Sequence, residues 1–260
     1  MEFSKKVLGN IGRCIYCGTS ELPLSEEHIV PYALNGRWTL QSASCSKCSG
    51  ITSQFERDVT QNLLASTRAF HQFKTRHPSL RPVSFPVEVI HKNGVEEKIE
   101  IPIEEYGAVT TFPIFEAPGY ITKNHIKGIL FKGHALNRNG GMDLIKLSKK
   151  YDAKAINFSS TFSPVNFARL IAKIAYGFAV SQFGLDEMKD SYVLPAILKQ
   201  KDEIGEWVGI DPWSRKMLNE DLGMEIFYKD GKMFATVRIF GKLEGAQTYI
   251  VVLGPEVKPL

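Results

Sequence analysis

The sequence predicts an α+β protein in which a small metal-braced N-terminal module precedes a larger mixed domain. Two observations predict this class. All four cysteines of the 260-residue chain stand near its start, whereas the later sequence alternates strand-like runs with one long helical pattern. A segment rich in basic residues and proline, 68–82, separates these two parts of the sequence. We therefore expect one domain at residues 1–81 and a second, α+β domain at residues 82–260.

The composition is that of an ordinary globular protein, with 43% hydrophobic and 23% charged residues. The net charge of +4 is only mildly basic, so bulk charge permits a nucleic-acid partner without arguing for one. Charges interrupt the apolar stretches well before the roughly 20 residues that a membrane span requires. We expect no membrane role.

Two Cys-x-x-Cys pairs, Cys14 with Cys17 and Cys45 with Cys48, are separated by 27 residues. Two such pairs can surround one Zn²⁺ with four thiolates. The alternative is a disulfide framework, which is typical of short secreted chains that carry a signal peptide. The first residues include two lysines but no apolar stretch of about 7 residues. The pattern therefore predicts a structural zinc site and a cytoplasmic location.

Residues 13–50 are expected to form a zinc-bound loop and turn module, because Asn35-Gly36 favours the turn of a hairpin. A helix should follow from Ile51 to about Phe70, where apolar residues recur every four positions with polar residues between them. These apolar residues are Ile51, Phe55, Val59 and Leu63. One face of the helix would pack and the other would be free for chemistry.

The segment 68–82 is the best candidate for a strip that follows a nucleic-acid backbone, because it concentrates positive charge. Its candidate phosphate contacts are Arg68, Lys74, Arg76 and Arg81. The alternative is a solvated linker whose charges only keep it soluble.

The turn between the cysteine pairs offers one more phosphate contact, Arg37. Its neighbour Asn35 could tie the loop down, although turn chemistry alone also explains Asn35-Gly36.

Strand patterns follow residue 82. Residues 83–90 and 95–103 flank an Asn93-Gly94 turn and predict a hairpin, and shorter apolar runs come at 108–115 and 126–131. We expect this domain to select the target, or to bind a protein partner or a second copy of the chain.

The last elements are a helix and strands. Ser163-Pro164 provides an N-cap and a first-turn proline for a long helix that ends near Gly184. A hairpin over 224–240 turns at Asp230-Gly231, and a final strand covers 249–253.

Glu27 and His28 place a carboxylate beside an imidazole between the cysteine pairs. Phosphodiester hydrolysis needs a base that accepts a proton from water and a cation that offsets phosphate charge. His28 suits the base, because an ordinary histidine pKa near 6.5 leaves it neutral at working pH. Glu27 is a candidate ligand for Mg²⁺ or Mn²⁺. The alternative is a hydrogen-bonded pair with a structural role.

Several strings of this sequence together resemble the HNH endonuclease family, over about residues 12–60. They are Cys14-Ile15-Tyr16-Cys17, Glu27-His28-Ile29-Val30-Pro31, Leu34-Asn35-Gly36 and Ala43-Ser44-Cys45-Ser46-Lys47-Cys48. The resemblance implies a treble-clef-like ββα-metal fold (also called a His-Me finger) braced by structural zinc. It also implies a DNA endonuclease, with RNA not excluded, and a bacterial or phage setting with a role in phage defence or restriction. His28 would activate water, and Glu27 would hold Mg²⁺ or Mn²⁺.

One position departs from the family pattern. Many members have Asn directly after the last cysteine, where its side chain holds the catalytic ion, and this chain has Ser49. Serine is a weaker and shorter ligand, so either water holds the ion or another residue supplies an oxygen. We expect Glu56, on the solvent-facing side of the predicted helix, to be that residue. The alternative is a surface ion pair at Glu56.

Two functions remain open at this point. The first is a metal-dependent endonuclease that uses His28, Glu27 and Glu56. The second is a zinc-braced module that binds nucleic acid or protein and has lost its catalytic ion through the Ser49 position.

Overall fold

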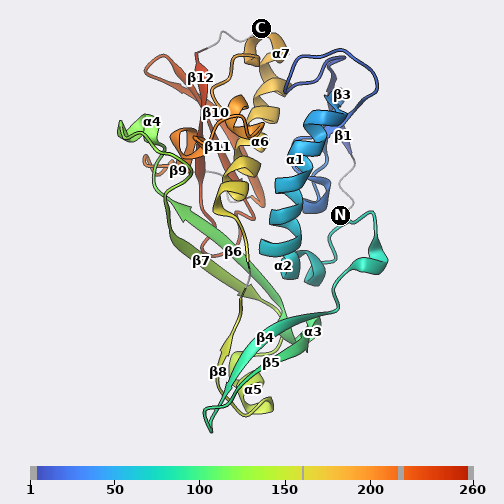
Figure 1. The fold of residues 1–260 in the computed structure, drawn as a ribbon, viewed down its shortest axis with the longest axis vertical. Coiled ribbons are helices and arrows are strands. Elements are labelled where there is room, and N and C mark those ends of the chain that lie inside the picture. Colours follow the sequence, from blue (N-terminus) through green and yellow to red (C-terminus); the bar gives the residue numbers. More distant parts are fainter. Residues whose placement is uncertain (1–4, 160, 216–219, 257–260) are drawn as a thin grey trace.

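The computed structural model describes residues 5–159, 161–215 and 220–256. Helices and strands are interspersed along the chain, which confirms the predicted α+β class. The molecule is elongated, with helices α1 and α6 side by side in its broader part and strands β4, β5 and β8 at the far end (Figure 1).

The N-terminal module is a three-stranded sheet followed by a helix. Its elements are β1 (Lys6–Asn10), β2 (Leu24–His28), η1 (Tyr32–Leu34), β3 (Trp38–Cys45) and α1 (Ser46–Asp58). Strand β3 is central and pairs with β1 in parallel and with β2 antiparallel. The order β2, β3, α1 is a ββα arrangement.

The predicted turn lies within the connection between β2 and β3. Asn35 adopts the left-handed conformation with φ of 60°, as the Asn-Gly pair indicates. Gly36 allows the chain to fold tightly, because a Cβ there would lie 1.8 Å from the Val30 carbonyl oxygen. The connection is longer than a two-residue hairpin turn because it also contains η1.

The helix predicted from Ile51 to Phe70 starts earlier and is interrupted. Helix α1 already begins at Ser46 and is followed by a π-helical turn, η2 (Val59–Leu63), and by α2 (Ala65–Phe70). The Thr60 hydroxyl donates to the Glu56 carbonyl oxygen at 2.7 Å, a side-chain bond that competes with the regular helical pattern. The four-residue spacing nevertheless marked the packed face correctly, since Phe55, Val59 and Leu63 are buried.

The far end of the molecule is a second, small sheet. Its elements, together with the preceding turn η3 (Pro78–Leu80), are β4 (Ser84–His91), β5 (Glu96–Pro102), α3 (Ile103–Tyr106), α5 (Leu144–Lys150) and β8 (Ala153–Asn157). The predicted hairpin at Asn93-Gly94 is confirmed by the antiparallel pairing of β4 with β5. Val89, Ile101 and Leu147 form its separate core.

An antiparallel pair connects this end to the rest of the chain. It consists of β6 (Ala108–Phe115) and β7 (Phe131–Asn139), with α4 (Gly119–Thr122) between them. The apolar run at 108–115 is therefore a strand, whereas the run at 126–131 is a loop that ends where β7 begins.

The remaining elements build the broader part. They are α6 (Pro164–Phe183), α7 (Leu185–Met188), α8 (Leu194–Ile197), α9 (Ile204–Trp207), β9 (Val208–Ile210), β10 (Leu222–Lys229), β11 (Lys232–Ile239) and β12 (Tyr249–Pro255). The predicted N-cap is confirmed, because the Ser163 hydroxyl accepts a hydrogen bond from the Asn166 amide at 3.3 Å. The hairpin at Asp230-Gly231 is also confirmed, in a sheet of order β10-β11-β12-β9.

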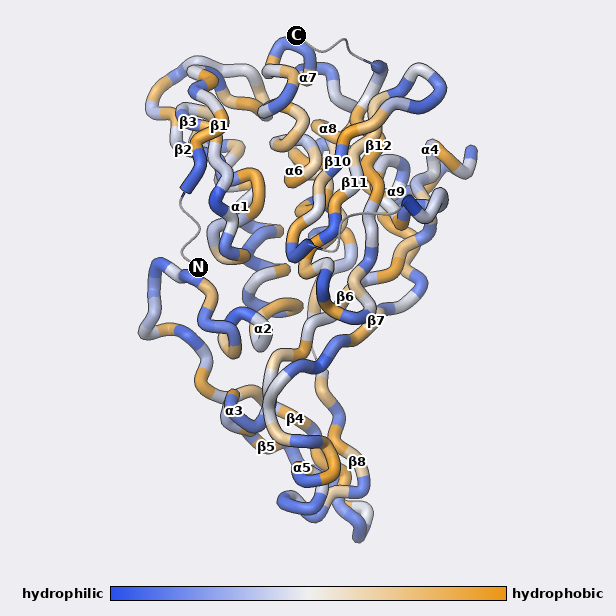
Figure 2. The backbone as a smooth tube through the Cα atoms, turned by 180° about the vertical axis from the view of Figure 1, so that it is seen from behind, coloured by the Kyte–Doolittle hydropathy of each residue, from blue (hydrophilic) through white to orange (hydrophobic). Residues whose placement is uncertain are grey.

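Helix α6 lies in the middle of one hydrophobic core that both ends of the sequence share. Ile15, Ile29 and Phe55 of the N-terminal module pack in the same cluster as Tyr176 of α6 and Val251 of β12. Figure 2 shows hydrophobic residues along α6, β11 and β12. Within the described residues, none of the helices is both long and apolar enough to cross a membrane.

Candidate active site and metal centre

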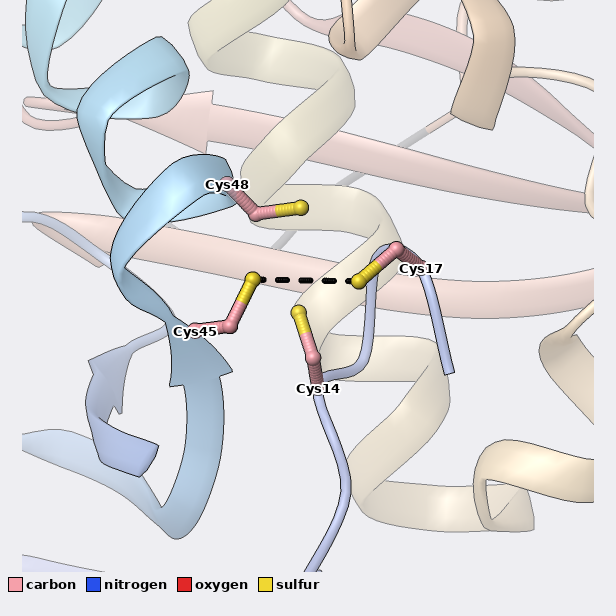
Figure 3. A group of neighbouring side chains, drawn as sticks. All are labelled: Cys14, Cys17, Cys45 and Cys48. Atoms are coloured by element: carbon pink, nitrogen blue, oxygen red, sulfur yellow. Dashed lines mark hydrogen bonds between the residues drawn. The ribbon is translucent and has the colours of Figure 1, made fainter. Parts of the chain in front are cut away.

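The four cysteines converge on one point, although they come from three local structures. Cys14 and Cys17 lie in the loop between β1 and β2, Cys45 ends β3, and Cys48 lies in the first turn of α1 (Figure 3). Their sulfur atoms all lie within 4.8 Å of one another, and those of Cys17 and Cys45 are 3.7 Å apart. Tetrahedral zinc with bonds of about 2.3 Å separates its sulfur ligands by about 3.8 Å. The cluster could therefore hold one zinc ion.

The state of the thiols agrees with a metal centre. All four cysteines are free. Burial works against ionisation of these thiols and raises the pKa of Cys14 and Cys48, but hydrogen bonds from the Cys48 backbone and the neighbouring thiols lower the Cys45 pKa to about 7. Thiolates are the form that binds zinc. The structure thus favours the zinc interpretation over the disulfide alternative.

His28 ends strand β2 on the partly exposed side of the module. Its side chain is 20% exposed, and its ring meets the Tyr32 ring edge-on at 5.7 Å between centroids. Burial lowers the pKa of His28, and the nearby Glu26 carboxylate opposes this effect only in part. The lowered pKa keeps the imidazole neutral at neutral pH, which is the form that accepts a proton.

The carboxylate beside His28 belongs to Glu26, a residue that the sequence analysis did not select. Its Oε1 atom lies 3.8 Å from Nε2 of His28, and its other oxygen contacts the Lys5 ammonium. The signal that could have found it is strand alternation, since residues two apart in a strand share a face.

Glu27 points away from this surface into the protein. It is 6% exposed, and the Tyr16 hydroxyl donates to its Oε1 atom at 3.0 Å. The same Oε1 atom lies 2.7 Å from the ammonium nitrogen of Lys173. Glu27 is therefore the centre of a buried polar cluster behind β2.

Glu56 reaches the same cluster from helix α1. Its Oε1 atom lies 2.9 Å from the Lys173 nitrogen, and its side chain is 24% exposed. Burial raises the pKa of Glu56, Lys173 counteracts this rise, and Glu27 adds to it. The residue faces α6, whereas the sequence pattern had favoured the solvent-facing side of the helix.

Lys173 joins the two carboxylates. Its side chain is 1% exposed, and its ammonium also donates to the main-chain oxygens of His28 and Ile29. Burial alone would lower the pKa of Lys173, but Glu27 and Glu56 outweigh burial and raise it to about 12. The sequence signal that could have found Lys173 is a lysine within a largely apolar helix, because such a lysine is buried and needs a charged or polar partner.

The three residues predicted to hold a divalent ion do not fit one as they lie here. Magnesium needs oxygen ligands at about 2.0–2.1 Å in near-octahedral geometry. The Lys173 ammonium stands between the Glu27 and Glu56 carboxylates. Ser49 instead donates from its hydroxyl to the Ser46 carbonyl oxygen within the first turn of α1.

The predicted basic strip runs beside the loop between β2 and β3. The Lys74 amide donates to the Asn35 side-chain oxygen at 3.1 Å, so Asn35 ties loop and strip together. The Arg68 guanidinium donates to the main-chain oxygens of Ala33 and Thr60. The Arg68 side chain therefore anchors the loop.

The other basic candidates differ in exposure. Lys74 and Arg76 are exposed, and Arg37 is half-buried. Arg81 is half-buried and donates to the Phe73 carbonyl oxygen at 2.7 Å. Lys74 and Arg76 are thus the candidates whose charged groups have most access to a polyanion.

Comparison with known families agrees with the geometry. Residues 14–64 match the family model described as HNH endonuclease, a range that includes the four cysteines, His28 and Glu56. No curated protein and no solved structure matches the chain. Residues 14–64 are therefore similar to an HNH endonuclease domain, which indicates nuclease activity in general and a nucleic-acid substrate.

Proposed function

We propose that the protein is an endonuclease that hydrolyses phosphodiester bonds in DNA and that His28 is its general base. The observation that carries the proposal is the position of His28. Within an HNH endonuclease domain, a partly exposed imidazole with a lowered pKa stands at the end of β2. Such an imidazole can take a proton from water as the water attacks a phosphorus atom.

Glu26 supports this role of His28. When the imidazole accepts the proton it becomes positively charged, and the Glu26 oxygen 3.8 Å from Nε2 stabilises that charge. We place Glu26 as a positioning residue, because it acts on His28 and not on the substrate.

The zinc centre has a structural role in this proposal. Four thiolates complete a tetrahedral shell and leave no position for water or phosphate. The metal joins the loop before β2, the end of β3 and the start of α1, and so holds the strand that ends in His28. Four reduced thiols also suit the cytoplasmic location that we expect.

HNH nucleases use a divalent ion, and the sequence analysis assigned Mg²⁺ or Mn²⁺ to Glu27, Glu56 and Ser49. Lys173 already pairs with both carboxylates, so we assign no catalytic step to an ion held by them. Exposed Lys74 and Arg76 are proposed to contact the phosphates of the bound strand.

The deciding experiment is a nicking assay on supercoiled plasmid with the zinc-loaded protein, with Mg²⁺ or Mn²⁺ added or withheld. Wild-type protein should nick the plasmid, and His28→Ala should slow nicking by about 10²–10⁴-fold, the usual contribution of a positioned base. His125→Ala is the matched control, because His125 is an exposed histidine that pairs with Glu206 far from the site in sequence. Zinc content should be equal in all three proteins.

The proposal fails if pure wild-type protein leaves plasmid, single-stranded DNA and RNA intact with every divalent ion tried. Cleavage of RNA alone would keep the role of His28 and correct the substrate.

A second candidate function is a module that binds nucleic acid without cutting it. Two observations favour it. Lys173 occupies the space between the Glu27 and Glu56 carboxylates, and Ser49 bonds within its own helix. This module would shift labelled DNA in a gel and leave it uncut.

A further inference from the structure

The Lys173 ammonium lies in an environment that resembles a cation site. Carboxylate oxygens of Glu27 and Glu56 lie at 2.7 and 2.9 Å, and the Ile29 carbonyl oxygen lies at 3.4 Å. The His28 carbonyl oxygen is a further contact. Oxygen atoms thus surround the nitrogen within an HNH endonuclease domain, while the lysine itself comes from helix α6, outside the matched residues 14–64.

Helix α6 is held firmly against the domain, so the ammonium cannot withdraw by a simple movement of the helix. One turn after Lys173, the Tyr176 hydroxyl donates to the Ile15 carbonyl oxygen. Gly177 packs directly against Ile29, since a Cβ on this glycine would come within 3.6 Å of the Ile29 side chain.

A second set of contacts fixes the start of α6. The Asn166 side-chain amide donates to the Asp58 carboxylate at 2.9 Å, and the Ser163 main-chain amide donates to the same oxygen at 3.3 Å. Asp58 ends helix α1, so α6 is joined to α1 before Lys173 and, through Tyr176, to the Cys14–Cys17 loop after it.

Charge explains why a cation is needed there at all. Two ionised carboxylates behind β2 would repel each other and lose hydration, at a cost that a paired positive charge offsets. The lysine supplies that charge permanently. A divalent ion held by both carboxylates would need an oxygen of each at about 2.1 Å, and the ammonium already contacts the Oε1 atom of both.

We propose that Lys173 is the resident cation of this HNH domain. It takes the place of a divalent ion between Glu27 and Glu56, and these two carboxylates therefore do not bind Mg²⁺ or Mn²⁺. The inference concerns cation binding, so it can be tested whether or not the protein cleaves DNA. It also means that the domain depends on α6 for a charged group at its centre.

The first test uses Mn²⁺ as the probe and electron paramagnetic resonance to count bound ions in the zinc-loaded protein. Wild type, Glu27→Gln and Glu56→Gln should show the same Mn²⁺ binding. A saturable Mn²⁺ site in wild type that disappears in either variant, with zinc content unchanged, would overturn the proposal.

The second test removes the lysine. Lys173→Met keeps the length of the side chain and leaves the carboxylate pair without its cation. We expect this variant to gain a Mn²⁺ site that binds at least about tenfold more tightly than any in wild type, equivalent to about 1.4 kcal/mol. Its thermal midpoint should rise on addition of Mn²⁺, because a ligand that binds only the folded state stabilises it.

Two controls separate this effect from general damage. The triple variant Lys173→Met, Glu27→Gln, Glu56→Gln has no net charge in the cluster and should fold without responding to Mn²⁺. Lys199→Met removes an exposed lysine that contacts Gln54 on the same helix α1 and should behave as wild type.

The outcomes decide the proposal even if Lys173→Met is unstable. Recovery of this variant as folded protein only in the presence of Mn²⁺ supports it. A folded Lys173→Met protein that binds no more Mn²⁺ than wild type contradicts it. If the variant does not fold under either condition, the comparison of wild type with Glu27→Gln and Glu56→Gln still decides.

Discussion

The Tyr176 hydroxyl donates a hydrogen bond to the main-chain oxygen of Ile15, which joins the middle of helix α6 to the loop between Cys14 and Cys17 of the four-cysteine cluster. Both residues are fully buried in one core. This buried hydrogen bond joins α6 to the N-terminal module in an apolar setting, in addition to the contacts of Lys173 one turn earlier.

Replacing this hydroxyl should destabilise the protein. Tyr176→Phe leaves the ring in place but removes the donor, so the buried Ile15 oxygen loses its partner at a cost of about 1–3 kcal/mol. Urea unfolding followed by circular dichroism measures this loss. Tyr32→Phe, at a half-buried tyrosine in the β2–β3 connection, is the control and should change stability by less than about 0.5 kcal/mol. Equal stability of Tyr176→Phe and wild type would show that the contact contributes nothing.

Removing zinc should unfold more than the cysteine loop. Structural zinc sites of this kind contribute on the order of 10–16 kcal/mol, and the module shares its core with α6. A strong chelator, or Cys48→Ser, should therefore lower helical circular dichroism and abolish cooperative thermal unfolding. Ser46→Ala, two residues before Cys48 in the first turn of α1, is the control and should retain zinc and cooperative unfolding. A chelated protein with an unchanged spectrum and midpoint would refute a structural role for the metal.

The pH dependence of cleavage should follow His28. The protonated imidazole cannot accept a proton, so activity is lost as pH falls through the His28 pKa and is full above it. Because burial lowers that pKa, the acid limb should lie below pH 6.5, the ordinary pKa of histidine. A profile of kcat/KM against pH measures it.

Glu26→Gln should move this limb further toward acid. The Glu26 carboxylate raises the His28 pKa, and its neutral replacement removes that effect. Glu21→Gln, at an exposed residue of the loop before β2, should leave the limb in place. If the acid limb of Glu26→Gln lies at the same pH as that of wild type, Glu26 does not influence His28 during catalysis.

Substitution of two arginines of the basic strip should affect stability differently. Arg68→Ala removes the donors to the Ala33 and Thr60 oxygens and should cost about 1–3 kcal/mol of stability. Arg76→Ala changes an exposed side chain and should leave stability within about 0.5 kcal/mol.

Arg76→Ala should affect DNA binding although it leaves stability unchanged. Arg76→Ala should reduce the slope of log affinity against log salt by about 1, the value for one lost phosphate contact. Fluorescence anisotropy over a salt series measures this slope. An unchanged slope would place the strip outside the nucleic-acid interface.

Local signals in the sequence predicted most turns and helix ends correctly. Asn93-Gly94 and Asp230-Gly231 each close a hairpin, and Ser163 caps helix α6. These features depend on the backbone preferences of two or three adjacent residues, so they need no knowledge of the rest of the fold. The helix over 51–70 was predicted less well. Its first residues, from Ser46, include Cys48 of the cysteine cluster and lack the apolar four-residue period, and near Thr60 it changes to a π-helical turn.

The sequence by itself predicted the four-cysteine cluster, and its resemblance to the HNH endonuclease family implied the ββα order and singled out His28. The spacing of the cysteines suffices for the cluster, since all four lie within 35 residues of one another along the chain. Only the tertiary structure decided that Glu27 turns inward and that Lys173 meets it and Glu56. That pairing joins a strand and two helices that are far apart in the sequence. Buried charges need partners, and these charges are buried only once α6 packs against the N-terminal module.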